Sequence, residues 1–198
     1  MSILTDTLPV SVEIGGKSYP INSDFRVGIQ FENLIMSGEE NPLNLLLPFF
    51  EDNLPDDLEG AFKAIEEFYC CGKLPEKKEK PTERNTKQAY SFDLDSEVIF
   101  SDFWNFYNID LSQEGLHWWS FRSLLFGLPE KSEFKQRAYY RTCSLKDLSK
   151  KERQRVLKIR SQIEIKAKED EKTTLNERNA QMKAYILKRQ KELAKVGE

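Results

Sequence analysis

The chain has 198 residues, of which 39% are apolar and 32% charged, so part of it is expected to be solvated helix or linker outside the core. Its formal net charge of −3 is unevenly spread: residues 1–71 hold three Lys or Arg against thirteen Asp or Glu (net −10), and residues 145–198 hold sixteen against nine (net +7). An acidic first third argues against a protein that coats DNA along its whole length, and the two ends are expected to attract each other or other molecules.

The cysteines and the apolar stretches bear on the compartment. Cys70 and Cys71 are adjacent, which disfavours a disulfide between them, and Cys143 stands alone. The first residues lack the basic start and long apolar run of a secretory leader, and the longest apolar stretch, residues 45–50, is too short to span a bilayer. We therefore expect reduced thiols in a soluble intracellular protein with no membrane contact.

Residues 1–71 are predicted to form an N-terminal unit, a β-hairpin packed on helices. Apolar residues alternate from Val10 to Ile14 and resume at Tyr19, and Gly15-Gly16 between these runs suits a tight turn. Helical spacing of apolar residues then predicts helices over residues 24–37, 43–54 and 56–71. The second of these contains Pro48, which predicts one kinked helix or two short ones.

Residues 72–89 are rich in charge and contain two prolines, so we interpret them as a linker between two folding units. The second unit, residues 90–148, is an aromatic-rich helical domain. Its helices are predicted to begin at the caps Asp95 and Ser112 and, in a third case, to cover residues 131–142. In that third helix Tyr139 is expected to face inward, together with Phe134 and Ala138.

Residues 149–198 are predicted to form a long basic helix. It begins with the capping-box spacing of Ser149 and Glu152, and no Gly or Pro follows until Gly197. Its basic face is either a solvated surface or a contact for acidic surface, from residues 39–67 of a neighbouring copy or from another protein; DNA phosphate is a weaker third choice. The candidate partner-binding residues on this face are Lys150, Lys151, Arg153, Arg155, Lys158 and Arg160.

No arrangement of residues predicts catalysis. The single histidine, His117, lacks the spaced ligands of a metal site and the partners of a nucleophile, so we interpret it as a core-edge residue satisfied by a hydrogen bond. The three tryptophans are interpreted as core, because no basic residue is interleaved with them before Arg122. There is no phosphate-cradling glycine motif. We therefore expect no catalytic, cofactor-binding or metal-binding residues and no enzymatic activity.

The expected fold is mainly α, with a small N-terminal β-hairpin packed on helices, a second helical unit and a long charged C-terminal helix. Within it, residues 90 to about 160 resemble the bacteriophage gene product fifteen family, small tail-gene proteins of siphophages and prophages of Gram-positive bacteria. The resemblance rests on Tyr90-Ser91-Phe92-Asp93, on Tyr107-Asn108-Ile109-Asp110-Leu111, on LHWWSFRSLLFGLP (residues 116–129) and on Tyr139-Tyr140-Arg141-Thr142. The N-terminal half is similar to the start of such proteins, whereas the extension after about residue 167 is not matched.

The resemblance implies a tail assembly chaperone, because the family's genes usually lie between those for the major tail protein and the tape measure protein. Such a chaperone would work in the host cytoplasm, shield the tape measure protein until tail tube subunits replace it, and associate with its own copies. The major tail protein is a further expected partner. The alternatives are a structural tail or connector component that stays in the virion and, less favoured, a nucleic-acid-binding regulator. The family brings no catalytic or metal residues.

Overall fold

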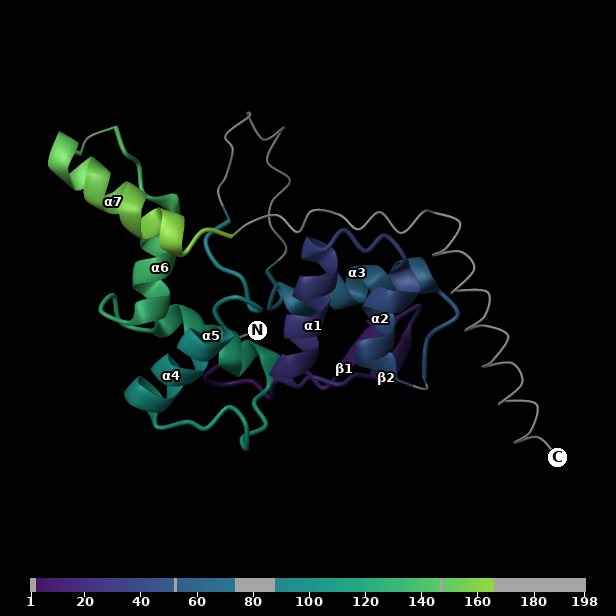
Figure 1. The fold of residues 1–198 in the computed structure, drawn as a ribbon. Helices are drawn as coiled ribbons and strands as arrows, with labels where there is room; N and C mark the ends of the chain where they lie inside the picture. Colours follow the sequence, from purple (N-terminus) through teal and green to yellow (C-terminus); the bar gives the residue numbers. More distant parts are fainter. Residues whose placement is uncertain (1–2, 52, 74–87, 147, 166–198) are drawn as a thin grey trace. The chain divides into compact units, whose positions relative to one another are not determined.

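The computed structural model describes residues 3–51, 53–73, 88–146 and 148–165. Over these residues the chain forms one hairpin and seven helices (Figure 1), which confirms the mainly α prediction. Residues 74–87, most of the predicted linker, lie outside the described ranges, as do residues 166–198. The elements in chain order are β1 (Ser11–Ile14), β2 (Lys17–Pro20), α1 (Phe25–Met36), α2 (Pro42–Phe50), α3 (Leu58–Tyr69), α4 (Ser96–Tyr107), α5 (Trp118–Gly127), α6 (Glu133–Thr142) and α7 (Lys150–Gln162).

The hairpin forms where the alternating pattern predicted it. β1 and β2 are antiparallel, with Val12 opposite Tyr19, and Gly15 and Gly16 take φ values of 57° and 77° in the turn. These angles suit glycine because it has no Cβ to clash with the backbone. Ile14 is buried where β1 packs on α3, so the hairpin gains the helical support that an isolated one lacks.

Most helices begin at a side-chain cap. Asp24, Asn41, Asp57, Ser132 and Ser149 each accept a hydrogen bond from a backbone N–H in the first turn of the helix that follows. Such a bond satisfies one of the free donors of the helix start and is worth about 1 kcal/mol. The polar residues that precede the apolar runs therefore fix most helix starts locally.

One predicted cap was wrong, and another is in place without its hydrogen bond. α5 begins five residues later than expected, with His117 as its cap, because Ser112 is held in a turn by hydrogen bonds from its backbone N and its Oγ to Asp110 Oδ1 (2.9 and 2.6 Å). Asp95 is the N-cap residue of α4, as predicted, but its side chain makes no capping hydrogen bond, because its carboxylate is bound by the arginines of α6. In both cases a second hydrogen-bonding partner competes with the helix end.

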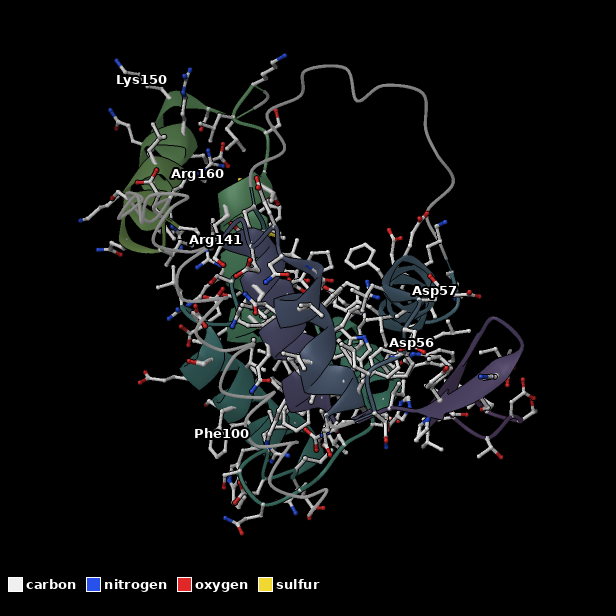
Figure 2. The ribbon with its side chains drawn as sticks, turned by 90° about the vertical axis from the view of Figure 1, so that its right-hand side faces the viewer. Asp56, Asp57, Phe100, Arg141, Lys150 and Arg160 are labelled. Atoms are coloured by element: carbon white, nitrogen blue, oxygen red, sulfur yellow. The ribbon has the colours of Figure 1, made fainter. Side chains whose placement is uncertain are left out.

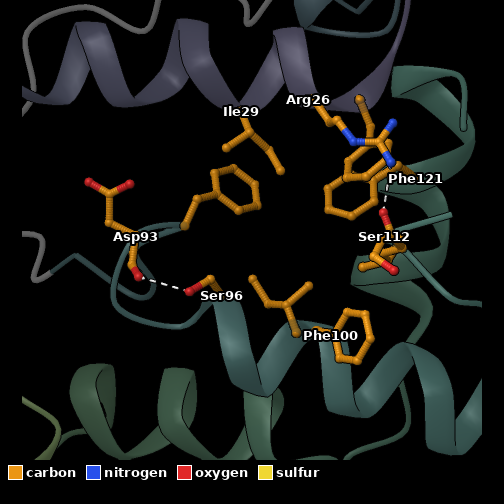
Figure 3. A pocket seen from close by; sticks show the side chains of 11 residues that line it. Arg26, Ile29, Asp93, Ser96, Phe100, Ser112 and Phe121 are labelled. Carbon is orange, nitrogen blue, oxygen red and sulfur yellow. Dashed lines mark hydrogen bonds between the residues drawn. The ribbon is translucent and has the colours of Figure 1, made fainter. Parts of the chain in front are cut away.

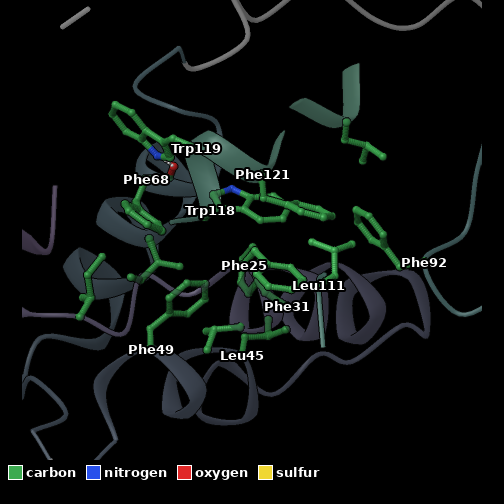
Figure 4. Close-up of a cluster of buried hydrophobic side chains, with 14 of the residues drawn as sticks. Phe25, Phe31, Leu45, Phe49, Phe68, Phe92, Leu111, Trp118, Trp119 and Phe121 are labelled. Atoms are coloured by element: carbon green, nitrogen blue, oxygen red, sulfur yellow. Dashed lines mark hydrogen bonds between the residues drawn. The ribbon is translucent and has the colours of Figure 1, made fainter. Parts of the chain in front are cut away.

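The two predicted folding units share one core, so their separation was wrong. Buried side chains from both sides of residues 74–87 form a single cluster (Figure 4), and the chain up to Ile165 is one compact unit. Phe25 of α1 stacks on Phe121 of α5 at 4.6 Å between ring centroids, and Gly28 lies so close to the Trp118 ring that a Cβ there would overlap it. A charged linker in the sequence therefore joins two halves that pack on each other.

The C-terminal helix is shorter than predicted. The capping box of Ser149 and Glu152 is present as expected, but α7 ends at Gln162, and residues 163–165 are not helical. Arg141 binds the carbonyl of Ile163 at 2.7 Å, so the chain is held by α6 directly after the helix end. The rest of the predicted long helix falls outside the described residues.

Candidate functional site

The tryptophan pair lies at the junction of the two halves of the chain. The Nε1–H groups of Trp118 and Trp119 donate to the carbonyls of Tyr69 and Phe68 at 2.9 and 2.7 Å, and Arg122 Nη1 donates to the Tyr69 carbonyl at 2.8 Å. These carbonyls lie at the C-terminal end of α3, where backbone acceptors lack helical partners and a positive charge is favourable. We call these contacts of α5 with the end of α3 the α3–α5 clamp.

Two of the three tryptophans are core, as predicted. Trp118 and Trp119 are buried, but Trp104 is 50% exposed on α4, so its interpretation as core was wrong. The prediction for Tyr139 was also wrong, because its ring is 57% exposed while Phe134 on the same helix is buried. Helical spacing predicted that the apolar residues of α4 and α6 are buried, but both helices carry more large apolar side chains than the neighbouring elements cover.

The prediction for His117 is confirmed. Its Nδ1 accepts a hydrogen bond from the Trp119 backbone N–H (3.1 Å), and its Nε2 lies 2.9 Å from the carbonyl of Pro9. Because Nδ1 accepts, Nε2 carries the proton and donates to Pro9. The histidine thus fixes the start of α5 and the N-terminal segment, and both ring nitrogens are used structurally.

A carboxylate lies beside the clamp among aromatic rings. Glu32 is buried on α1 and accepts hydrogen bonds from the hydroxyl groups of Tyr69 and Tyr90. Burial, with the Glu32 hydrogen bond and charge adding to it, raises the pKa of Tyr69 far above its usual range, and Arg122 opposes this only weakly. The tyrosine hydroxyls therefore stay protonated and serve as donors to the buried carboxylate.

A buried ion pair joins the segment before α4 to α6. Arg141 donates to both oxygens of Asp95 (2.5 and 2.9 Å) and to the carbonyl of Ala89 (3.1 Å), while Ser91 donates its backbone N–H to Asp95. Burial favours the neutral acid, but the hydrogen bonds from Arg141 and Ser91 and the charges of Arg141 and Arg137 outweigh it and lower the pKa of Asp95. Every acceptor of this carboxylate is engaged in holding the fold.

A pocket of about 450 Å³ opens between α1 and α4, a size usual for binding pockets. Figure 3 shows Ile29 of α1 and Phe100 of α4 on opposite sides of it, with Phe121 of α5 at one end. The Phe100 side chain is 40% exposed, so the pocket can be reached from the surface. The residues that line it are Phe25, Arg26, Ile29, Phe92, Asp93, Ser96, Ile99, Phe100, Leu111, Ser112 and Phe121.

The surroundings of the pocket are acidic. Arg26 is its one lining cation, and it is paired with Asp24 (3.0 Å) and bound to the carbonyl of Leu111 (2.8 Å). Four further carboxylates lie on the lining segments or next to them: Asp93, Glu97, Asp110 and Glu114. The sequence reasoning missed this site, although a signal was present: residues 88–121 contain six Asp or Glu and no Lys or Arg.

The predicted basic residues lie on α7, five of them exposed. Lys150, Lys151, Arg153, Arg155 and Lys158 are exposed to solvent. Arg160 is different, because its guanidinium donates to the carbonyls of Tyr140 and Cys143, both at 2.9 Å, and so holds α7 against α6. These six residues are brought together on one helix, but they and the pocket belong to different elements. Whether they bind a partner stays a prediction.

Several features bear on the kind of chemistry available. The thiols of Cys70, Cys71 and Cys143 are free, and burial raises the pKa of the first two, which disfavours their reactive thiolate form. In the described residues, no three His, Cys, Asp or Glu side chains gather where a metal ion would fit. No helix found there is both long and apolar enough for a membrane span.

The described residues therefore define a mainly α protein with an N-terminal hairpin. Its candidate binding surfaces are the pocket between α1 and α4 and the exposed basic residues of α7. The family model described as "Bacteriophage Gp15 protein" matches residues 4–185. The chain belongs to this family, as the motifs of residues 90–142 indicated, and is thus a phage structural or morphogenesis-related protein. No curated protein and no solved structure matches it.

Proposed function

We propose that this protein is a tail assembly chaperone, which binds and shields the tape measure protein in the host cytoplasm and catalyses no reaction. Membership of the bacteriophage Gp15 family supports a role in making the particle. The major tail protein is the second partner proposed, because tail tube subunits take the place of a chaperone when the tube is built.

The observation that carries this proposal is the exposure of large apolar side chains on the outer surfaces of successive helices. A long helical client exposes apolar faces, and a protein that shields it needs apolar side chains in reach. Isolated exposed residues are ordinary, but exposed aromatic residues on neighbouring elements favour a binding surface. Those on helices are Ile35 and Met36 of α1, Phe100 and Trp104 of α4, Phe126 of α5, Tyr139 of α6 and Leu157 of α7.

Co-expression with the tape measure protein tests the proposal. The tagged chain is expected to retain the tape measure protein in a pull-down and to increase its soluble amount. The double variant Phe126→Asp/Tyr139→Asp is expected to lose most of this retention, because a charge on an apolar contact must be desolvated. Leu4→Asp/Val10→Asp, which adds the same two charges at other exposed apolar residues, is the matched control and is expected to retain the client. Equal retention by all three proteins, or none by the wild type, contradicts the proposal.

Two other functions have distinct signatures. A structural tail or connector component would be found by mass spectrometry in purified particles, whereas a chaperone is absent from them. A nucleic-acid-binding regulator would use the basic face of α7, and an electrophoretic shift would show affinity that falls steeply between low and high salt. A pull-down of the tape measure protein with no electrophoretic shift favours the chaperone over the regulator.

A further inference from the structure

We propose that copies of this chain associate head to tail, with the basic helix α7 of one copy bound at the pocket between α1 and α4 of the next. This contact is between copies and does not depend on the identity of any client. It follows from two surfaces of opposite charge that the same chain carries on different elements.

The receiving surface combines an apolar pocket with a negative rim. On the described segments that line it or next to them, one arginine, Arg26, stands against five carboxylates: Asp24, Asp93, Glu97, Asp110 and Glu114. Hydrogen bonds from Ser112 lower the pKa of Asp110, which keeps this carboxylate charged. An apolar centre with a rim of one charge selects a ligand with an apolar anchor and the opposite charge around it.

Helix α7 has these properties. It contains six basic residues and one acidic residue, and its buried contact with the rest of the fold is made by Val156. Leu157, about 100° further round the helix, is 44% exposed. Because residues three, four and seven positions apart share a helix face, Leu157 lies in one stripe with Arg153 and Lys150. An exposed leucine between cations is the complement of the pocket and its rim.

The two surfaces belong to different parts of the compact unit. Arg160 on α7 donates to the carbonyls of Tyr140 and Cys143 at the end of α6, and Arg141 on α6 donates to the carbonyl of Ile163 just after α7. Each copy's α7 is therefore held by the α6 of the same copy. Lys150 on α7 and Phe100 at the pocket do not lie side by side in Figure 2. A contact between unlike surfaces on separate copies is heterologous, so it builds head-to-tail rings or open chains of copies.

The acidic surface of α3 is the competing site for α7. It contains Asp56, Asp57, Glu59, Glu66 and Glu67, of which the first two are labelled in Figure 2. Asp57 caps α3 and Glu59 pairs with Lys63 at 2.7 Å, just as Asp24 pairs with Arg26 and Asp110 accepts from Ser112 at the pocket, so charge alone does not separate the two surfaces. The pocket is favoured because it offers an apolar seat for Leu157 in addition to charge.

Sedimentation velocity of the full chain over a range of concentrations tests the proposal. The weight-average sedimentation coefficient is expected to rise with concentration at low ionic strength and to fall toward the monomer value in high salt, which screens charges beyond about 3 Å at 1 M. The variants Lys150→Glu/Arg153→Glu on α7 and Glu97→Lys/Glu114→Lys at the pocket are each expected to weaken association about tenfold or more, because two attractive charges at the contact become repulsive.

Mixing separates this interface from a general charge effect. Each double variant alone keeps only one of the two surfaces intact, whereas a mixture offers the unchanged α7 of the pocket variant to the unchanged pocket of the α7 variant and is expected to restore association between the two. Glu66→Lys/Glu67→Lys changes the net charge by the same amount on α3 and is expected to leave association unchanged. Leu157→Asp is expected to weaken association alone, to regain it when mixed with the pocket variant, whose α7 is unchanged, and not to regain it when mixed with the charge variant of α7.

The proposal is overturned by a wild-type chain that stays monomeric at every concentration. It is overturned equally if the α3 variant weakens association and the pocket variant does not, which would assign the contact to α3. Circular dichroism and thermal melting of each variant verify that it is folded. Loss of client capture with intact self-association would contradict the proposed function alone, and the reverse would contradict this interface alone.

Discussion

Trp118 is buried and Trp104 is half-exposed, and the regions around these two tryptophans differ in the same way. In the α3–α5 clamp, indoles and a guanidinium are buried or half-buried, and each meets a backbone carbonyl. On the outer face of α4, Phe100 and Trp104 are exposed beside an open pocket with an acidic rim. The tryptophan motif that carries the family resemblance thus holds the two halves together, and the surface that we propose for a partner lies elsewhere.

The largest loss of stability is expected when the α3–α5 clamp is broken. Trp118→Ala removes a ring that is 1% exposed and its hydrogen bond to Tyr69, and should lower the free energy of unfolding by about 3–5 kcal/mol. Trp118→Phe is the control: it keeps most of the packing, and Arg122 still satisfies the Tyr69 carbonyl, so a clearly smaller loss is expected. Chemical denaturation measures both. A loss below about 1 kcal/mol for the alanine variant would contradict the description of the clamp as core.

The second prediction concerns the ion pair that holds α6 to the segment before α4. Asp95→Asn leaves Arg141 buried without its counter-charge, and the expected loss is about 3 kcal/mol near neutral pH. The folded pKa of Asp95 lies below its ordinary value of 3.8, so the unfolded chain binds the proton more tightly. Stability from this group is therefore present above pH 3.8 and is lost as the pH falls through the lower, folded pKa.

The pH dependence gives this prediction its control. Because protonated aspartic acid and asparagine are both neutral, the stability difference between wild type and Asp95→Asn should shrink as the pH is lowered below 3.8. Urea denaturation at a series of pH values measures it. A difference that stays constant down to acid unfolding would show that Asp95 does not act through its charge.

Much of the fold could be predicted from the sequence because its signals are local. The Gly15-Gly16 turn, the helix start near residue 24 and the capping box at Ser149 each depend on residues within four positions, and each was found where expected. The union of the two halves could not be predicted, because it depends on Gly28 meeting Trp118 across ninety residues of chain. Local patterns also do not show competition between partners: Asp95 stands at the N-cap of α4 without a capping hydrogen bond, and Ser112 bonds Asp110 and caps no helix.

The candidate site was less accessible to sequence reasoning than the fold. The basic run of α7 was visible as a charge pattern, and the structure adds that Arg160 is used to hold the helix. The pocket was invisible because Ile29, Phe100 and Leu111 come from three segments and look like ordinary core residues in the sequence. The sequence shows only the charge around the pocket, as a long stretch without Lys or Arg from residue 88 to residue 121.

A third prediction concerns the close packing of α1 against α5 in the buried region. Gly28→Ala places a methyl group against the Trp118 ring, and since α1 and α5 must move apart, we expect a loss of about 1–3 kcal/mol. An alanine in an exposed part of a helix would instead stabilise it relative to glycine by about 1 kcal/mol. The double variant Gly28→Ala/Trp118→Phe should lose less than the sum of the two single losses, because the smaller ring leaves room for the methyl group. Additive losses would place the strain elsewhere than at this contact.

The smallest change in stability is expected at the exposed face of α4. Trp104→Ala should change the free energy of unfolding of the isolated chain by less than about 1 kcal/mol, because half of the side chain is already in water. Acrylamide should quench Trp104 and spare the buried Trp118 and Trp119, so this variant should lose the accessible fraction of the fluorescence. The measurement needs two protein concentrations, since any contact that covers α4 stabilises the folded state by mass action. A cost that grows with concentration would mean that another copy covers this face, and a cost as large as that of Trp118→Ala in the dilute chain would contradict the division of the molecule into a buried clamp and an open surface.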